Sequence, residues 1–394
     1  MCLVAATYGL VRLAYGLFLP DIQSELGLSA AGAGFISSGS SLTYCLAAAA
    51  GLGLGHRSPR LLIVAAALTA CGGAWGMAAA DTVAWFGTAA VISSAGAGFA
   101  SPALVTIVDR NVDSRHVDSA QSVVNAGTGP GLVGAAVLAL LVASEWRVAW
   151  IVTGALTAGF AAAVLAVDRR RSSQPRSTQS QPLSRAWVAD HRNAIAAAVL
   201  MGAGSSAVWT FGRSLLVETG SHSESVTVGA WIALGLGATV VILTAHPMAK
   251  LSATTAWILS CTVIAFALLL LTIGARSLLV ALLACLIFGW GFTAATSSLI
   301  AWTTGIDPAH GAAGTAMLFV ALVFGQAIGA TALGFVIADK SFSAAFAVSS
   351  VITAIAIGIA ALDRCRPSGP SRRHRVQMRA KGLSAFHGGR DRYR

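Results

Sequence analysis

The chain has 394 residues, of which 56% are hydrophobic and only 10% are charged, with a mean hydropathy of +0.75. A soluble protein of this length needs about a quarter of its residues charged, so this composition excludes a soluble globular enzyme and predicts that hydrocarbon surrounds most of the chain. The net charge of +11 is typical of nucleic-acid binding, but the basic residues lie between long apolar runs, which argues against a nucleic-acid partner.

Twelve apolar runs have the length of about 20 residues that a helix needs to cross a bilayer. They predict an all-α polytopic membrane protein. In chain order, the expected spans are 3–20, 31–54, 61–80, 83–108, 121–143, 146–167, 193–217, 226–248, 255–275, 277–303, 311–338 and 342–362.

One segment between the spans, 168–192, is rich in Arg, Ser, Gln and Pro and predicts a flexible linker. It divides the chain into an N-terminal six-helix bundle (1–167) and a C-terminal six-helix bundle (193–362). A basic tail (363–394) follows. Its composition is typical of disorder, and it could bind anionic lipid headgroups or stay solvated in the cytoplasm.

The positive charges predict the orientation of the spans. If the N-terminus is cytoplasmic, 21 of the 26 Lys and Arg residues fall on the cytoplasmic side, 3 fall outside, and 2 lie within spans. Short loops rich in Lys and Arg stay in the cytoplasm. We therefore expect a multi-pass protein of the inner (plasma) membrane with both termini and the linker in the cytoplasm.

Short patterns recur in matching spans of the two halves and predict duplicated, parallel repeats. The recurring patterns are Tyr8-x-x-x-Arg12 with Trp209-x-x-x-Arg213 (offset 201), Gly96-Ala97-Gly98-Phe99 with Gly289-Trp290-Gly291-Phe292 (offset 193), and Gly129 with Gly325 (offset 196).

Three sequence features are shared with a known family: Tyr15-Gly16-Leu17-Phe18-Leu19-Pro20, Trp209-Thr210-Phe211-Gly212-Arg213 and Trp146-Arg147. Through them, residues 1–362 resemble the major facilitator superfamily (MFS), and within it a large, poorly characterised bacterial branch. The resemblance implies a secondary transporter in which two six-helix bundles alternate the access to one central solute site.

Two motifs of that superfamily are incomplete here. The signature loop after the second span has Gly55 near the place of its usual Asp, and Arg60 is the part that survives. In the fifth span, 127–134 resembles part of the Gly-Pro motif of drug/proton antiporters. Arg60, Gly129 and Pro130 are therefore candidate gating residues, although a static kink would explain Gly129 and Pro130 equally well.

The most informative residues are Arg12 and Arg213, because a charge at bilayer depth costs several kcal/mol unless it faces a partner or a watery cavity. None of the fifteen acidic residues falls at mid-span, and the nearest are Asp21 and Glu218, which close the outer ends of the first and seventh spans. We therefore expect both arginines to face the cavity and bind a substrate anion. This resembles organophosphate antiporters of the superfamily, which have one such arginine in each half. The alternative is that each arginine bonds to a neighbouring helix.

Four further polar or aromatic residues are candidates for the same cavity. Tyr8 and Trp209 lie one turn before the two arginines and could stack on a guanidinium or a substrate ring. Asn125 and Gln326 could line the site. Packing and hydrogen bonding between helices are the competing explanations for all four.

The sequence thus predicts a secondary transporter of a small solute, with an organic or amphiphilic anion, exported, as the favoured substrate. We expect a monomer that is not an enzyme, with no cofactor and no metal site. A non-transporting sensor or receptor on the same fold is one alternative. A drug/proton antiporter for non-anionic compounds is another.

Overall fold

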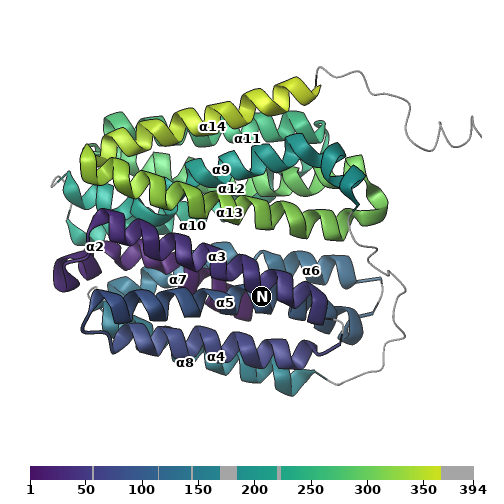
Figure 1. The fold of residues 1–394 in the computed structure, drawn as a ribbon, viewed down its shortest axis with the longest axis horizontal. Helices are drawn as coiled ribbons and strands as arrows, with labels where there is room; N and C mark the ends of the chain where they lie inside the picture. The colour runs from purple at the N-terminus through teal and green to yellow at the C-terminus, as the bar shows by residue number, and fades with distance from the viewer. Residues whose placement is uncertain (56, 114, 143–144, 169–183, 220–222, 365–394) are drawn as a thin grey trace, which may run out of the picture.

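The computed structural model describes the chain except for residues 56, 114, 143–144, 169–183, 220–222 and 365–394. In the described residues, twelve helices are long and apolar enough to cross a membrane. They run side by side in two groups, the N-terminal half in purple to blue and the C-terminal half in teal to yellow (Figure 1). The predicted all-α fold with two six-helix bundles is confirmed.

The N-terminal half begins with a continuous helix that consists of α1 (Cys2–Val4), the π-helical η1 (Ala5–Leu13) and α2 (Ala14–Leu26). The following helices are α3 (Ala30–Leu54), α4 (Pro59–Ala78), α5 (Val83–Asn111), α6 (Val117–Asn125), α7 (Thr128–Leu141) and α8 (Trp146–Val167). α6 and α7 together form the fifth span. The helix is interrupted directly before Thr128, so Pro130 lies in the first turn of α7, where a missing N–H is tolerated.

The C-terminal half consists of α9 (Arg185–Glu218), α10 (Glu224–Ala249), α11 (Ala253–Gly274), α12 (Leu278–Ile306), the short η2 (Pro308–His310), α13 (Gly311–Asp339) and α14 (Phe342–Arg364). The start of α9 corrects the predicted linker, because 185–192 is helical. The Ser184 side chain caps this helix by accepting a hydrogen bond from the Trp187 N–H at 3.1 Å. Residues 169–183 of the linker and 365–394 of the tail lie outside the described residues.

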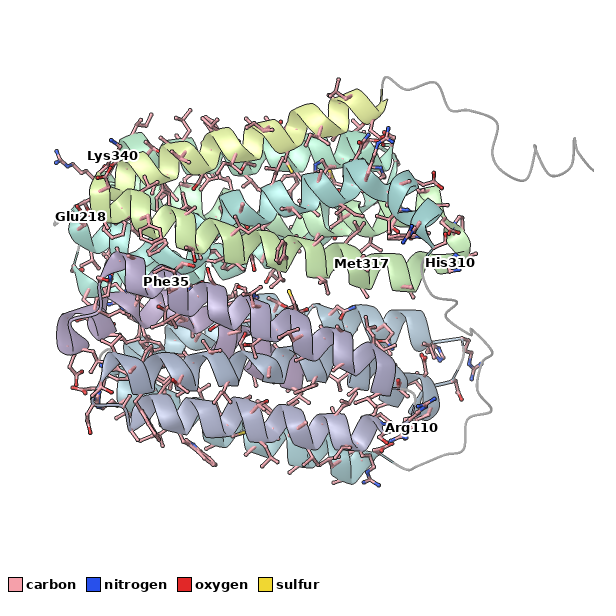
Figure 2. The ribbon with its side chains drawn as sticks, in the orientation of Figure 1. Phe35, Arg110, Glu218, His310, Met317 and Lys340 are labelled. Atoms are coloured by element: carbon pink, nitrogen blue, oxygen red, sulfur yellow. The ribbon has the colours of Figure 1, made fainter. Side chains whose placement is uncertain are left out.

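The two ends of the bundle carry the residues that the topology prediction assigns to opposite sides. Glu218 and Lys340 lie at one end, and Arg110 and His310 at the other (Figure 2). We call the first end outer and the second end inner, following the predicted orientation.

Two equivalent helix contacts reveal the repeat that relates the halves. A Cβ on Gly131 of α7 would lie 2.5 Å from the carbonyl oxygen of Ala5, and a Cβ on Gly325 of α13 would lie 2.0 Å from that of Val199. Both positions therefore require glycine. The two pairs are related by one sequence offset. Val199 follows Ala5 by 194 residues, and Gly325 follows Gly131 by the same number.

This offset changes two of the sequence matches. The structural counterpart of Gly325 is Gly131 rather than Gly129. At this offset the position that matches Arg12 is Ser206, and Arg213 lies seven residues beyond it, which is about two helical turns. The aromatic-x-x-x-Arg patterns therefore do not occupy equivalent positions in the two halves.

The halves meet where α2 packs on α9, α3 on α13, and α7 on α10. Near the outer end, the rings of Phe35 and Phe335 pack edge to face with centroids 5.4 Å apart. One turn further in, the Ser38 hydroxyl contacts the Ala327 carbonyl and bonds to the Thr331 hydroxyl at 2.6 Å. Close packing between the halves therefore covers the outer part of the site described next.

Candidate functional site

A small cavity lies between the halves at the level of Arg12. Its volume is about 40 Å³, which is enough for a few water molecules and too small for an organic solute. An organic solute therefore does not fit this site in the conformation described. Residues from both halves line it, among them Arg12, Ser41, Ser94, Trp209, Thr210 and Gln326.

Arg12 lies at the end of η1, a π-helical stretch of the kind that often marks functional sites. Its Nη2 donates to Gln326 Oε1 of the other half at 2.9 Å and to Ser41 Oγ at 3.4 Å. The guanidinium carbon lies 4.9 Å from the centre of the Tyr44 ring. Its buried Nε has no hydrogen-bond partner among the described residues. No carboxylate of the described residues lies within 4.0 Å of it.

Arg213 does not line this cavity, and the prediction that it faces the site without an acidic partner is wrong. Its side chain is 1% exposed, and its Nη1 lies 2.5 Å from Asp21 Oδ2 of α2. Its Nη2 lies 3.5 Å from Glu224 Oε1 of α10. The Leu17 carbonyl accepts from Nη1 at 2.6 Å, and the Thr227 hydroxyl accepts from Nε at 3.2 Å.

Helix depth explains this difference between the two arginines. Arg213 lies within two turns of Glu218, where α9 ends, whereas Arg12 lies about four turns from the outer end of its helix at Leu26. Near the outer end, carboxylates of neighbouring helices can reach the guanidinium and still keep one side in water. Arg12 is too deep for any of these helix-end acids.

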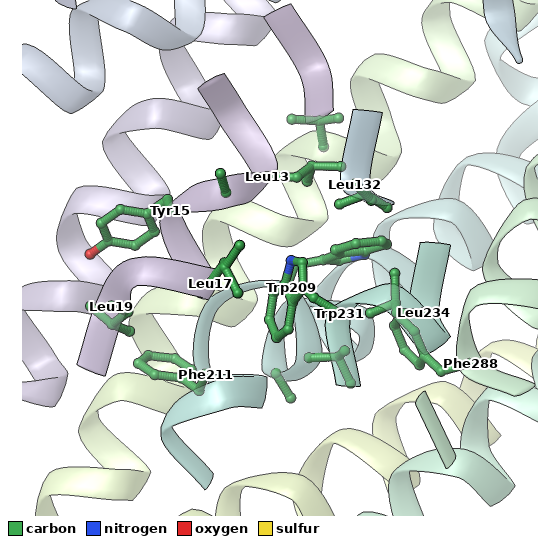
Figure 3. Packing of buried hydrophobic residues seen from close by; sticks show 14 of the residues in the cluster. Leu13, Tyr15, Leu17, Leu19, Leu132, Trp209, Phe211, Trp231, Leu234 and Phe288 are labelled. Atoms are coloured by element: carbon green, nitrogen blue, oxygen red, sulfur yellow. The ribbon is translucent and has the colours of Figure 1, made fainter. Parts of the chain in front are cut away.

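Trp209 reaches the cavity, but neither Trp209 nor Tyr8 stacks on an arginine. The Trp209 ring packs edge to face against Phe288 and Phe292, with centroids 5.6 and 5.0 Å away. Figure 3 shows it between Leu17 of α2 and Trp231 and Phe288 of the C-terminal half.

Tyr8 and Asn125 lie outside the cavity wall. The Tyr8 hydroxyl contacts that of Tyr44 and lies 3.4 Å from Ser101 Oγ. Tyr44, rather than Tyr8 or Trp209, places its ring under a guanidinium. Asn125 ends α6 and is exposed.

Among the described residues, no group of three or more His, Cys, Asp or Glu side chains could hold a metal ion.

The profile of the Major Facilitator Superfamily matches residues 1–323, most of the chain. The chain belongs to this superfamily. No curated protein sequence matches it. Its membership makes it a secondary transporter of the membrane rather than an enzyme, in agreement with the sequence prediction.

Solved MFS structures share the fold at low sequence identity. The nucleoside transporter NupG is 14% identical with a TM-score of 0.77, over 93% of this chain and 97% of that one. The peptide transporter POT is 13% identical with a TM-score of 0.74, over 91% and 92%. A bacterial homologue of the human lysosomal transporter Spinster is 13% identical with a TM-score of 0.68, over 91% and 94%. At such identities the likeness shows the fold alone, and the two named cargoes, nucleosides and peptides, differ.

The MFS signature loop, which lacks its usual Asp here, lies next to an ion-pair cluster at the inner end. The Asp168 carboxylate, 0% exposed, contacts the Arg110 guanidinium and lies 3.5 Å from Arg60 Nε. Asn111 Nδ2 donates to it at 2.9 Å, and Arg60 Nη2 donates to the Leu165 carbonyl at 2.6 Å. The cluster joins the inner ends of α4, α5 and α8 within the N-terminal half.

Sequence reasoning assigned no role to Asp168, Glu224 or Ser94. Asp168 follows a span and Glu224 begins one. Solvated acids at helix ends occupy the same kind of position in the sequence, so this position does not reveal the partners of the two acids. Ser94 belongs to the pair Ser93-Ser94 in an otherwise apolar run of α5, and this pair was the available signal.

Replacing Asp168 by Asn should destabilise the N-terminal half. The substitution leaves the Arg60 and Arg110 guanidinium groups close together without their carboxylate, and breaking a buried ion pair costs about 3–5 kcal/mol. We expect the midpoint of thermal unfolding in detergent to fall by at least about 5 °C. Asp113→Asn is the control, because Asp113 and its partner Arg115 are 70% and 78% exposed and such pairs contribute little. Equal midpoints for the two variants would contradict a structural role of the cluster.

Proposed function

We propose that this transporter carries a small organic anion by alternating access and that Arg12 binds the negative charge of the anion. One observation carries the proposal: a guanidinium lies in the cavity between the halves with no carboxylate near it among the described residues. Arg12 is partly buried, and a charge withdrawn from water without a counter-charge is unfavourable. An anion in the cavity would supply that counter-charge.

The present partners of Arg12 compensate its charge only in part. Gln326 and Ser41 offer neutral dipoles, and the Tyr44 ring offers the negative face of its π-system. A carboxylate or similar group accepts shorter and stronger bonds from a guanidinium than a neutral oxygen does. These contacts therefore hold the Arg12 side chain in place without a substrate. They are weak enough for an anion to compete with Gln326 for the guanidinium.

Arg213 serves the outer closure in this proposal. It joins α2 to α9 and α10 through Asp21 and Glu224. Two more bonds between the halves support the same closure, from Ser37 to Thr210 and from Ser214 to Gln23. Opening to the outside requires these contacts to separate.

Opening toward the inner side would occur by a hinge motion at the contact between α7 and α10. A Cβ on Gly129 would lie 3.0 Å from Thr239 Oγ1 of α10, so the two helices pack closely beside the interruption before α7. Gly129 and Pro130 remain our proposed hinge, and Arg60, fixed to Asp168, would move with the N-terminal half as one body. The likeness of 127–134 to the antiporter motif favours export of an amphiphilic anion.

Two alternatives use the same fold. A drug/proton antiporter for non-anionic compounds would leave the Arg12 charge uncompensated. A non-transporting sensor would fit the incomplete signature loop. Flux of solute into proteoliposomes separates the transporter from the sensor, and the charge of the transported compound separates the two transporters.

Replacing Arg12 should reduce anion transport. Loss of one charge-assisted contact costs roughly 1.5–3 kcal/mol, which is about a tenfold to hundredfold loss of affinity. We expect this loss for Arg12→Ala in proteoliposome uptake, and a partial rescue for Arg12→Lys, which keeps the charge and loses the planar fork. Arg115→Ala, at a surface-exposed arginine, should behave as wild type. Normal anion uptake by a correctly folded Arg12→Ala protein would refute the proposal, as would a cationic or neutral substrate.

Separating Arg213 from Asp21 should open the outer side. A cysteine introduced at Ser206 in a chain without its native cysteines reports access to the cavity from outside. We expect Asp21→Asn to increase the rate at which an impermeant thiol reagent labels this cysteine, because the ion pair that joins α2 to α9 is lost.

Asp81→Asn is the matched control for this measurement. Asp81 also pairs with an arginine at the outer end, Arg147 at 3.7 Å, but its side chain is 92% exposed. The control should label like the parent protein. Unchanged labelling in Asp21→Asn would show that the Arg213 cluster does not hold the outer side closed.

A further inference from the structure

The wall of the cavity carries one charge. Arg12 is the charged side chain among the described residues that line it. Its structural counterpart in the other half is Ser206, a hydroxyl, which bonds to the Ala203 carbonyl at 2.7 Å. The second membrane-embedded arginine, Arg213, is already balanced by Asp21 and Glu224. The site can therefore neutralise a single negative charge.

Three residues of the same wall have a polar side-chain atom that is itself buried and makes no hydrogen bond within the described residues. Trp209 is 8% exposed and Ser94 is 1% exposed, and neither the indole Nε1 of Trp209 nor the Oγ of Ser94 has a partner. Arg12 Nε is the third such atom. Other buried indoles also lack a partner, but they do not line the cavity: Trp150, Trp187, Trp231 and Trp257.

These unmade bonds define the chemistry of an occupant. An indole N–H and a guanidinium N–H can only donate, so the groups that satisfy them must be acceptors. A hydroxyl such as that of Ser94 can donate or accept and adapts to either. The occupant should therefore present one acceptor at Arg12 and another toward Trp209.

We infer that the site selects organic monoanions, namely carboxylates that carry a second, uncharged hydrogen-bond acceptor such as a carbonyl, and that Trp209 recognises this second acceptor. The inference rests on the proposed transport of anions and narrows it. Dicarboxylates and phosphate esters are excluded as preferred substrates because they carry two charges.

The cost of an unpaired charge decides between monoanions, dianions and neutral solutes. A monoanion balances Arg12 and leaves the cavity neutral. A dianion brings a second charge into a wall of hydroxyls and apolar groups, where it would lose water without gaining a counter-charge. A neutral solute leaves the guanidinium unbalanced. The acceptor at Trp209 adds a bond that a plain fatty acid cannot make.

Equilibrium dialysis of the purified full chain with radiolabelled probes tests this order. Levulinate is a monoanion with a carbonyl, valerate is the matched monoanion without it, glutarate is the matched dianion, and levulinamide is the matched neutral compound. Pyruvate and propionate form a shorter pair. We expect at least one oxo acid to bind about three- to tenfold more tightly than its plain partner, and glutarate and levulinamide to bind at least about tenfold more weakly than levulinate.

Trp209→Phe removes the indole N–H and keeps an aromatic ring. It should bring the oxo acid down to the affinity of its plain partner and leave the affinity for the plain acid unchanged. Trp257→Phe is the matched control, because Trp257 is also buried without a partner for Nε1 but lies away from the cavity. The preference for the oxo acid should persist in that variant.

The outcomes separate this inference from the proposed function. Glutarate binding as tightly as levulinate, with both lost in Arg12→Ala, would overturn the monoanion inference and leave anion transport standing. Equal affinities of oxo and plain acids in the wild type, or a preference that survives Trp209→Phe, would overturn the role of Trp209. Tightest binding by levulinamide would overturn the inference and the proposed function together.

Discussion

A charged side chain surrounded by apolar helices must find an opposite charge or remain a source of instability. This protein meets that constraint in two ways. Toward the ends of the bundle, Arg213 and Asp168 are buried with opposite charges from neighbouring helices. At the centre, Arg12 has dipoles and an aromatic ring but no carboxylate among the described residues. The uncompensated charge therefore coincides with the interface between the two halves, where we propose that the cargo binds.

The distribution of these charges also separates rigid from movable contacts. Asp168 joins helices within one half, so its ion pairs can persist while the halves rock. Arg213 and Arg12 each bond across the halves, so their contacts must break and reform in each cycle. The outer contact is an ion pair that water can replace, because Glu224 is 56% exposed and Asp21 is 23% exposed. In our proposal, the central contact is the one that the substrate anion replaces.

Much of the fold could be predicted because bilayer thickness and loop charge are properties of contiguous sequence. Most of the twelve apolar runs predict the helix bounds to within a few residues, and Gly129 and Pro130 predict the break before Thr128. The start of α9 was placed too late, since Arg185, Arg192 and other polar residues in its first turns look like linker. The cap at Ser184 and the burial of Trp187 and His191 hold the helix there.

The cavity wall could be predicted in part. Arg12, Trp209 and Gln326 line it, and they are conspicuous in the sequence as polar or large groups in apolar runs; their binding of a substrate stays a prediction. The role of Arg213 could not be predicted, for two physical reasons. Its acidic partner Asp21 is 192 residues away in the chain, and no local pattern reports such a pairing. The apparent repeat at offset 201 also differs from the contact-based offset of 194, so resemblance in sequence placed the arginine two turns too deep.

The most direct test of an uncompensated charge at Arg12 is to supply the compensation within the protein. Gln326→Glu changes the group that accepts from Arg12 Nη2 at 2.9 Å into a carboxylate of the same shape. If the account is correct, thermal unfolding of the variant without added anions will occur at a higher temperature than for the wild type, and binding of levulinate will be lost. A lower unfolding temperature together with levulinate binding equal to that of the wild type would contradict it.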